Sequence, residues 1–233
     1  GMYESGNNLS LAKGIRGLVG YWKFDEGTGT SAYDSSGNGN TGTLLPTTST
    51  PTWVAGQVGG ALSFNGSNNY VYLSSVSNIN LGSNFTVSHW VKAVSDRGHF
   101  RIILGKGAKT SSPTSMHLET YFGTTGYMSL YIPNLSPQGL ASTITVDDNK
   151  WHLNTFTFDG SFIRLYVDGI LNNSISASGS ITSGTTWVAF APSTLIDATY
   201  GGTFPFMGSL DDVRIYNRAL SAAEIMALYN ATR

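Results

Sequence analysis

The sequence contains no cysteine, which excludes disulfides, thiolate nucleophiles and zinc sites built on cysteine. Charged residues make up only 12% of the chain, against roughly 25% in an ordinary soluble domain. The formal net charge is -1, which argues against nucleic acid as a partner because such proteins carry a basic surface. No apolar run approaches the roughly 18 residues that a membrane span requires. We therefore expect no membrane insertion by this chain.

Glycine is abundant instead, with 28 residues. Segments typical of β-strands recur at short intervals between turn-forming residues, and no helices lie between them, which favours an antiparallel sandwich over a parallel α/β sheet. Asp168-Gly169 is the strongest hairpin signal among these turns. The pattern predicts strands over residues 17–25, 71–73, 85–91, 100–104, 116–122, 127–132, 162–167 and 170–171.

The chain divides into a short lead and one domain. We expect residues 1–16 to be a polar lead or linker, of the kind left when an anchoring region is trimmed, and residues 17–233 to form a single β-sandwich. One helix is predicted over 222–229. Ser221 and Glu224 have the spacing of a capping box, in which each side chain satisfies a free backbone N–H. This helix should close one end of the sandwich.

Seven sequence blocks occur in a fixed order between residues 17 and 229: Gly20–Gly27, Asp34–Asn40, Gly59–Gly66, Phe85–Val91, Trp151-His152, Leu165–Gly169 and Gly208–Leu220. Together they resemble the laminin-G-like (concanavalin A-like lectin/glucanase) domain family. The resemblance implies an all-β, concanavalin A-like jelly roll of two antiparallel sheets, with the first and last strands side by side. It also implies a secreted or cell-surface location and an adhesion or binding role, as in modules of bacterial surface proteins and glycan-active enzymes.

A candidate calcium site lies in the second block. Its oxygen-bearing side chains at alternating positions, followed by glycine, are typical of the first part of a calcium loop. They belong to Asp34, Ser36, Asn38 and Asn40. The loop lacks the usual terminal carboxylate, and the resemblance implies Asp211, in the last strand, as the missing donor, with Asp25 and Glu26 as further candidates. Alternatively the block is only a turn, because Asp, Asn, Ser and Gly dominate turns.

A candidate glycan site lies on the hairpin over 116–132, where side chains alternate between two faces. The residues expected to face the core are Met116, Leu118, Met128, Leu130 and Ile132. The residues expected on the other face are His117, Glu119, Tyr121, Tyr127 and Tyr131. Tyrosine rings suit the apolar face of a sugar and their hydroxyl groups suit its hydroxyls. The alternative is cross-strand tyrosine pairing that only stabilises an exposed sheet.

No catalytic pattern is present. Hydrolysis of glycosides needs two carboxylates on one face, but Glu119 stands alone in its strand and the adjacent Asp211 and Asp212 are expected to point to opposite faces. Nucleophile elbows, phosphate loops and dinucleotide fingerprints are also missing. We therefore expect a non-catalytic extracellular carbohydrate-binding or adhesion module with a structural calcium ion, whose partner is a glycan or a cell-surface protein. The alternative is a structural or protein-interaction spacer of a surface or pilin-like protein.

Overall fold

The computed structural model describes residues 16–74, 76, 78–95, 98–107, 116–181, 187–192 and 204–233. For Met116 and His117 it describes the backbone only. Of the polar lead expected over residues 1–16, residues 1–15 lie outside the described residues. No helix in the described ranges combines the length and the apolar character that crossing a membrane would need.

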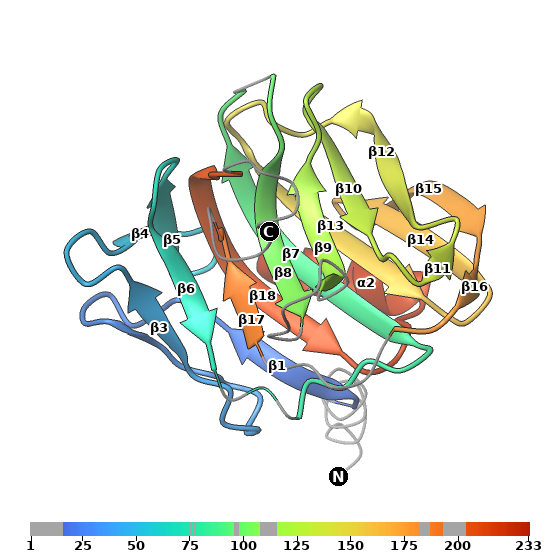
Figure 1. Cartoon of the computed structure of the whole chain (residues 1–233), viewed down its shortest axis with the longest axis horizontal. Coiled ribbons are helices and arrows are strands. Elements are labelled where there is room, and N and C mark those ends of the chain that lie inside the picture. Colours follow the sequence, from blue (N-terminus) through green and yellow to red (C-terminus); the bar gives the residue numbers. More distant parts are fainter. Residues whose placement is uncertain are drawn as a thin grey trace, which may run out of the picture.

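Two large sheets, each of eight strands, form the two layers of the molecule (Figure 1). We call the first one sheet A. In spatial order it contains β15 (Ile170–Ser176), β14 (Phe162–Val167), β13 (Trp151–Phe158), β7 (Phe85–Ala93), β18 (Met207–Tyr216), β5 (Gly60–Asn65) and β4 (Thr52–Ala55), and β1 (Leu18–Trp22) also pairs with β18. All of its ladders are antiparallel.

The second layer, sheet B, is also antiparallel. In spatial order it contains β12 (Gly139–Thr145), β10 (Tyr127–Tyr131), β9 (Met116–Phe122), β8 (Arg101–Gly107), β17 (Trp187–Phe190), β6 (Tyr70–Leu73), β3 (Gly42–Leu45) and β2 (Ser31–Ala32). A two-stranded ladder joins β11 (Leu135–Ser136) to β16 (Ser178–Gly179). The two sheets confirm the expected jelly-roll fold.

The core lies between the two sheets and consists of alternate side chains of their strands. At its centre Trp22 and Phe24 both contact the edge of the Phe190 ring, with centroids 4.9 Å and 5.8 Å apart. Phe24 has a φ of 58°, so the backbone leaves the ladder there. For this reason β1 ends at Trp22, three residues before the predicted end of the strand.

The first and last strands lie side by side, as expected. Tyr21 pairs with Arg214 and Trp22 with Val213 in the ladder between β1 and β18. A strand pairing between residues about 190 positions apart therefore holds β1 and β18 in register.

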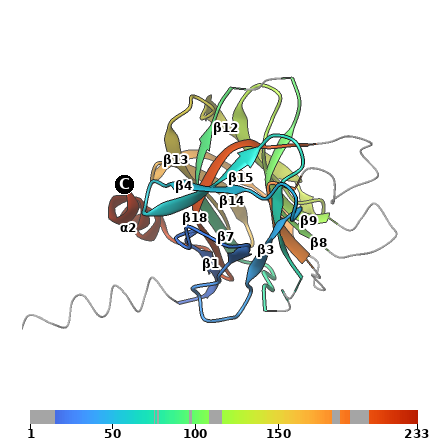
Figure 2. The same cartoon turned by 90° about the vertical axis from the view of Figure 1, so that its left-hand side faces the viewer.

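Helix α2 (Ala222–Thr232) lies against the outer face of sheet A (Figure 2). The capping box of Ser221 and Glu224 is confirmed, and the helix is three residues longer than predicted. The Trp90 ring lies 5.7 Å from that of Tyr229, and the Trp90 indole N–H donates to the Thr232 hydroxyl at 3.0 Å. The last turns are thus stabilised by contacts with sheet A that no local pattern reveals.

Candidate functional site

The Asp34 loop is held by its own hydrogen bonds. One carboxylate oxygen of Asp34 accepts from the backbone N–H of Tyr21 and Ser36, at 3.0 Å and 2.8 Å. The other accepts from the backbone and side-chain N–H groups of Asn40, both at 2.9 Å. Burial raises the pKa of Asp34, but these hydrogen bonds outweigh it and lower the pKa below its ordinary value. This is the geometry of a turn built around a carboxylate.

The amides of this loop act as donors. The side-chain N–H₂ of Asn40 donates to the carbonyl of Val19 at 2.9 Å, and that of Asn38 donates to the Ser36 hydroxyl at 3.0 Å. Asn38 also reaches the carbonyls of Leu18 and Val19 at 3.3 Å. The loop therefore clamps β1 through its N–H groups.

Asp211 does not meet this loop. Trp22 forms a bridge with Asp34 on one edge of β1 and pairs with Val213 of β18 on the other, so β1 lies between the two aspartates. Asp211 lies two residues before Val213 in β18, past the end of β1, and has no partner in that ladder. The expected set of Asp34, Ser36, Asn38, Asn40 and Asp211 is therefore not assembled as one site, because adjacent terminal strands place the loop and the last strand on opposite sides of β1.

Asp211 instead lies beneath the turn between β4 and β5. One of its carboxylate oxygens, Oδ2, accepts from the backbone N–H of Val58 at 2.8 Å. Oδ1 is buried and has no hydrogen-bond partner, although the residue is 0% exposed. Burial raises the pKa of Asp211 to about 7, and the neighbouring Asp212 and Asp25 carboxylates add to the shift.

Asp25 binds the same turn, accepting from the backbone N–H of Gly60 at 2.7 Å. The turn needs glycine, because a Cβ on Gly56 would lie 2.6 Å from the Asp211 carboxylate and 2.3 Å from the carbonyl oxygen of Gly60. A Cβ on Gly60 would lie 2.4 Å from the carbonyl oxygen of Phe24. Two carboxylates and two backbone carbonyls thus converge on one short segment.

The expectation that Asp211 and Asp212 face opposite sides is wrong. A β-bulge interrupts the pairing of β18 with β7 between Asp211 and Arg214, and Asp212 has a φ of 53°. Asp212 accepts from the Tyr21 hydroxyl at 2.5 Å and pairs with Arg214 at 2.8 Å, on the outer face of sheet A. Among the described residues, no three His, Cys, Asp or Glu side chains are grouped so that they could hold a metal by themselves.

The candidate glycan face is built from the hairpin of β9 and β10. Leu118, Met128, Leu130 and Ile132 are buried in the core, as expected. Glu119 pairs with Tyr131, and Tyr121 pairs with Ser129, so these side chains belong to the outer face of sheet B. Tyr127 lies two residues before Ser129 in β10, so its side chain is on the same face, and it is exposed. The backbone of His117 lies in β9, but its side chain is outside the described residues.

The three tyrosines occupy successive rows of the sheet, because Tyr131, Tyr121 and Tyr127 lie two residues apart in register. With about 3.3 Å per residue, the set spans roughly 13 Å along the hairpin. The Phe100 ring lies 5.6 Å from that of Tyr121 and 6.4 Å from that of Phe204. Sequence reasoning missed Phe100 and Phe204 as members of this face, since nothing local links them to the hairpin.

Glu119 has small or aromatic neighbours in register. Gly105 of β8 lies on one side of it and Tyr131 of β10 on the other, and Ala189 of β17 follows beyond Gly105. The Tyr72 ring of β6 lies past Ala189 and packs with it. None of these four neighbours in register is a carboxylate.

A family model described as the concanavalin A-like lectin/glucanases superfamily matches residues 64–226. Curated proteins give no significant match. Among solved structures, domain 4 of AbnA, an extracellular arabinanase from Geobacillus stearothermophilus in complex with arabinotriose, has a TM-score of 0.68 at 21% identity over 91% of this chain and 98% of that one.

Two further structures share the fold. The binding domain of Paraclostridial Mosquitocidal Protein 1 has a TM-score of 0.68 at 19% identity, over 92% of this chain and 52% of that one. A Trypanosoma rangeli sialidase has a TM-score of 0.65 at 17% identity, over 91% of this chain and 32% of that one. The chain therefore spans about half or less of the length of these two proteins.

Proposed function

The chain belongs to the concanavalin A-like lectin/glucanase superfamily, and we propose that it is a non-catalytic carbohydrate-binding module of a secreted or cell-surface protein. The observation that carries the proposal is the outer face of sheet B, where Glu119 and Tyr131 lie opposite each other and Tyr121 and Tyr127 continue the same face. Aromatic rings pack on the C–H faces of sugars, and a carboxylate accepts from their hydroxyl groups.

The similar structures support this class of ligand. One is an arabinanase domain in complex with arabinotriose, and another is a toxin's binding domain. With few charges on the whole chain, the surface suits neutral partners better than highly charged ones. Arabinotriose is the first oligosaccharide to test.

The test is a titration of the protein with neutral oligosaccharides such as arabinotriose, xylotriose and cellotriose, with binding measured by calorimetry or NMR. We expect Tyr131→Ala and Tyr121→Ala to weaken binding at least about tenfold, the equivalent of 1.4 kcal/mol. Tyr33→Ala is the matched control, because Tyr33 is 61% exposed and lies outside sheet B. If all three variants bind as the wild type does, the tyrosine face is not the site; if no sugar binds, the spacer function is favoured instead.

We also propose that calcium binds at Asp211 and Asp25, beneath the turn of Gly56 to Gly60. The supporting observation is the buried carboxylate oxygen of Asp211 that has no partner, since burying an uncompensated charge is expensive. Oxygen ligands of this kind, carboxylates together with backbone carbonyls, are those that calcium prefers. The ion would stabilise the fold by binding to the native state only.

Thermal unfolding with calcium and with a chelator tests this placement. The wild type should unfold at a higher temperature with calcium, and Asp211→Asn should abolish the difference. Asp34→Asn is the matched control: it should lower stability through its lost hydrogen bonds but keep the calcium shift. The opposite pattern, with the shift lost in Asp34→Asn only, would return the ion to the Asp34 loop.

A further inference from the structure

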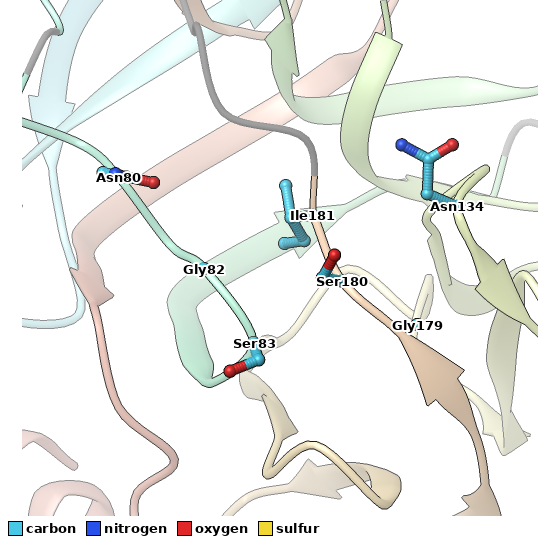
Figure 3. Close-up of a pocket in the computed structure, with 7 residues that line it drawn as sticks. All are labelled: Asn80, Gly82, Ser83, Asn134, Gly179, Ser180 and Ile181. Carbon is cyan, nitrogen blue, oxygen red and sulfur yellow. The ribbon is translucent and has the colours of Figure 1, made fainter.

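A cavity of about 710 Å³ lies among three segments, and none of its described lining residues is a tyrosine (Figure 3). Its walls come from residues 80–83, between β6 and β7, from Asn134, between β10 and β11, and from Gly179 to Ile181. In Figure 3, Ser180 and Ile181 lie between the segment of Asn80 and the segment of Asn134. The volume is within the range of roughly 300–1,000 Å³ that ligand pockets occupy.

The frame of this cavity is held by backbone contacts. Leu135 pairs with Gly179 in the ladder of β11 and β16. The N–H of Ile181 donates to the carbonyl of Gly82 at 3.2 Å. The side chains of Leu135 and Ile181 are both part of the buried core. Because the walls are tied to each other and to the core, the cavity is formed before any ligand arrives, which lowers the entropic cost of binding.

The lining selects the chemistry of the ligand. Among the described residues that line it, the polar side chains are the amides of Asn80 and Asn134 and the hydroxyls of Ser83 and Ser180, and none is charged. Amides and hydroxyls both donate and accept hydrogen bonds, as sugar hydroxyls do. A charged ligand would lose hydration there without meeting an opposite charge.

Gly82 leaves one wall of the cavity without a side chain. Gly82 has a φ of 55°, and a Cβ built on it would have no atom within 4 Å. The space above this backbone is therefore open, so a ligand can approach the peptide groups of the wall. Close approach of a ligand to the main chain is a common reason for glycine at such a position.

We propose that this cavity is a second carbohydrate subsite, which binds a short neutral oligosaccharide independently of the tyrosine face. The inference takes its ligand class partly from the proposed function, but its geometry does not depend on Tyr121 or Tyr131. Two separate contacts on one glycan would raise the overall affinity through effective concentration, without a new interface.

The absence of cysteine makes the test specific. Ser180→Cys introduces one thiol at the cavity, which a bulky maleimide then modifies. Ser67→Cys, in the exposed turn after β5, is the matched control and receives the same label. Arabinotriose, xylotriose and cellotriose are titrated into the labelled and unlabelled proteins by calorimetry and by amide NMR. The label at position 180 should reduce affinity at least tenfold at one of two binding steps, whereas the label at position 67 should leave both unchanged.

The outcomes separate this proposal from the tyrosine face. Binding that survives Tyr131→Ala but is blocked by the label at position 180 supports the cavity and counts against the tyrosine face. Binding that Tyr131→Ala removes completely, with no effect of the label at position 180, overturns the cavity and leaves the tyrosine face intact. Binding that neither change affects overturns both.

Discussion

Removing Asp147 should destabilise the protein far more than removing its neighbour Asp148. Asp147 pairs with Arg101 at 3.1 Å, and the two side chains are 2% and 0% exposed. Arg101 also donates to the Val94 carbonyl at 2.9 Å and lies 4.7 Å above the Phe122 ring. Removal of Asp147 therefore takes the carboxylate partner from a guanidinium that is fully buried.

The magnitude follows from the burial. Breaking a buried ion pair by removing one partner costs about 3–5 kcal/mol, because the other charge stays buried and uncompensated. A domain of this size loses roughly 2–4 °C of melting temperature per kcal/mol, so Asp147→Ala should lower the melting temperature by about 6–20 °C. Asp148 is 41% exposed and pairs with Lys150 at the surface, where such pairs contribute about 0–1 kcal/mol.

The assay is thermal unfolding followed by circular dichroism, with urea unfolding as a second measure. Asp147→Ala is compared with Asp148→Ala and with the double variant Arg101→Met/Asp147→Ala. We expect the second substitution to restore part of the lost stability, because it removes the buried charge. Equal melting temperatures for Asp147→Ala and Asp148→Ala would refute this reasoning. It would also be refuted if the double variant lost more stability than Arg101→Met and Asp147→Ala lose together.

Three further outcomes are expected. The hydrogen bond that the His152 imidazolium donates to the Asp168 carboxylate raises the pKa of His152. The stability that this pair contributes is therefore fully present below about pH 6.5 and is lost as pH rises through the raised pKa. Melting temperatures across that range should fall more in the wild type than in His152→Gln. Ser221→Ala removes the hydroxyl that accepts the capping hydrogen bond from the N–H of Glu224. It should lower the free energy of unfolding, measured with urea, by about 1 kcal/mol. Gly60→Ala should cost about 1–3 kcal/mol through overpacking, because its Cβ meets a backbone carbonyl at 2.4 Å, and a variant as stable as the wild type would contradict that clash.

The hairpin of β9 and β10 could be predicted because its information is local. The alternation of Leu118, Glu119 and Tyr121 sets which side chain faces the core, and the glycines at 123 and 126 mark the turn. The observed bounds of β9 match the prediction and β10 ends one residue earlier. The contacts of Phe100 with Tyr121 and with Phe204 escaped prediction because they depend on which strands and loops become neighbours.

The Asp34 loop shows why residue types alone do not define a calcium site. Asp, Ser and Asn at alternating positions suit an ion and suit a turn equally well. The choice depends on where the N–H groups point. Here the backbone N–H groups of Tyr21, Ser36 and Asn40 point at the Asp34 carboxylate. The N–H of Tyr21 is directed there by the bridge between Trp22 and Asp34, which joins segments that are apart in the sequence.

Asp211 was predicted from the sequence as a calcium ligand together with the Asp34 loop, but its carboxylate lies at the turn between β4 and β5. A strict alternation along β18 would send Asp211 and Asp212 to opposite faces, and the bulge before Arg214 removes that alternation. One extra residue lets Asp212 pair with Arg214 while Asp211 stays beneath the turn that follows β4. A bulge has no reliable signature in a single sequence, since it is set by how two paired strands share their hydrogen bonds.

The glycines of the turn between β4 and β5 make room for carboxylates. Gly56 and Gly59 allow the turn to approach the carboxylates of Asp211 and Asp25, respectively, at distances that a side chain would prevent. A turn that only reverses the chain needs glycine for its dihedral angles, and neither Gly56 nor Gly60 has a positive φ. At these two positions glycine provides space next to oxygen atoms. Backbone N–H groups of this turn donate to both carboxylates, and Oδ1 of Asp211, which has no hydrogen-bond partner, is the oxygen that the proposed calcium ion would bind.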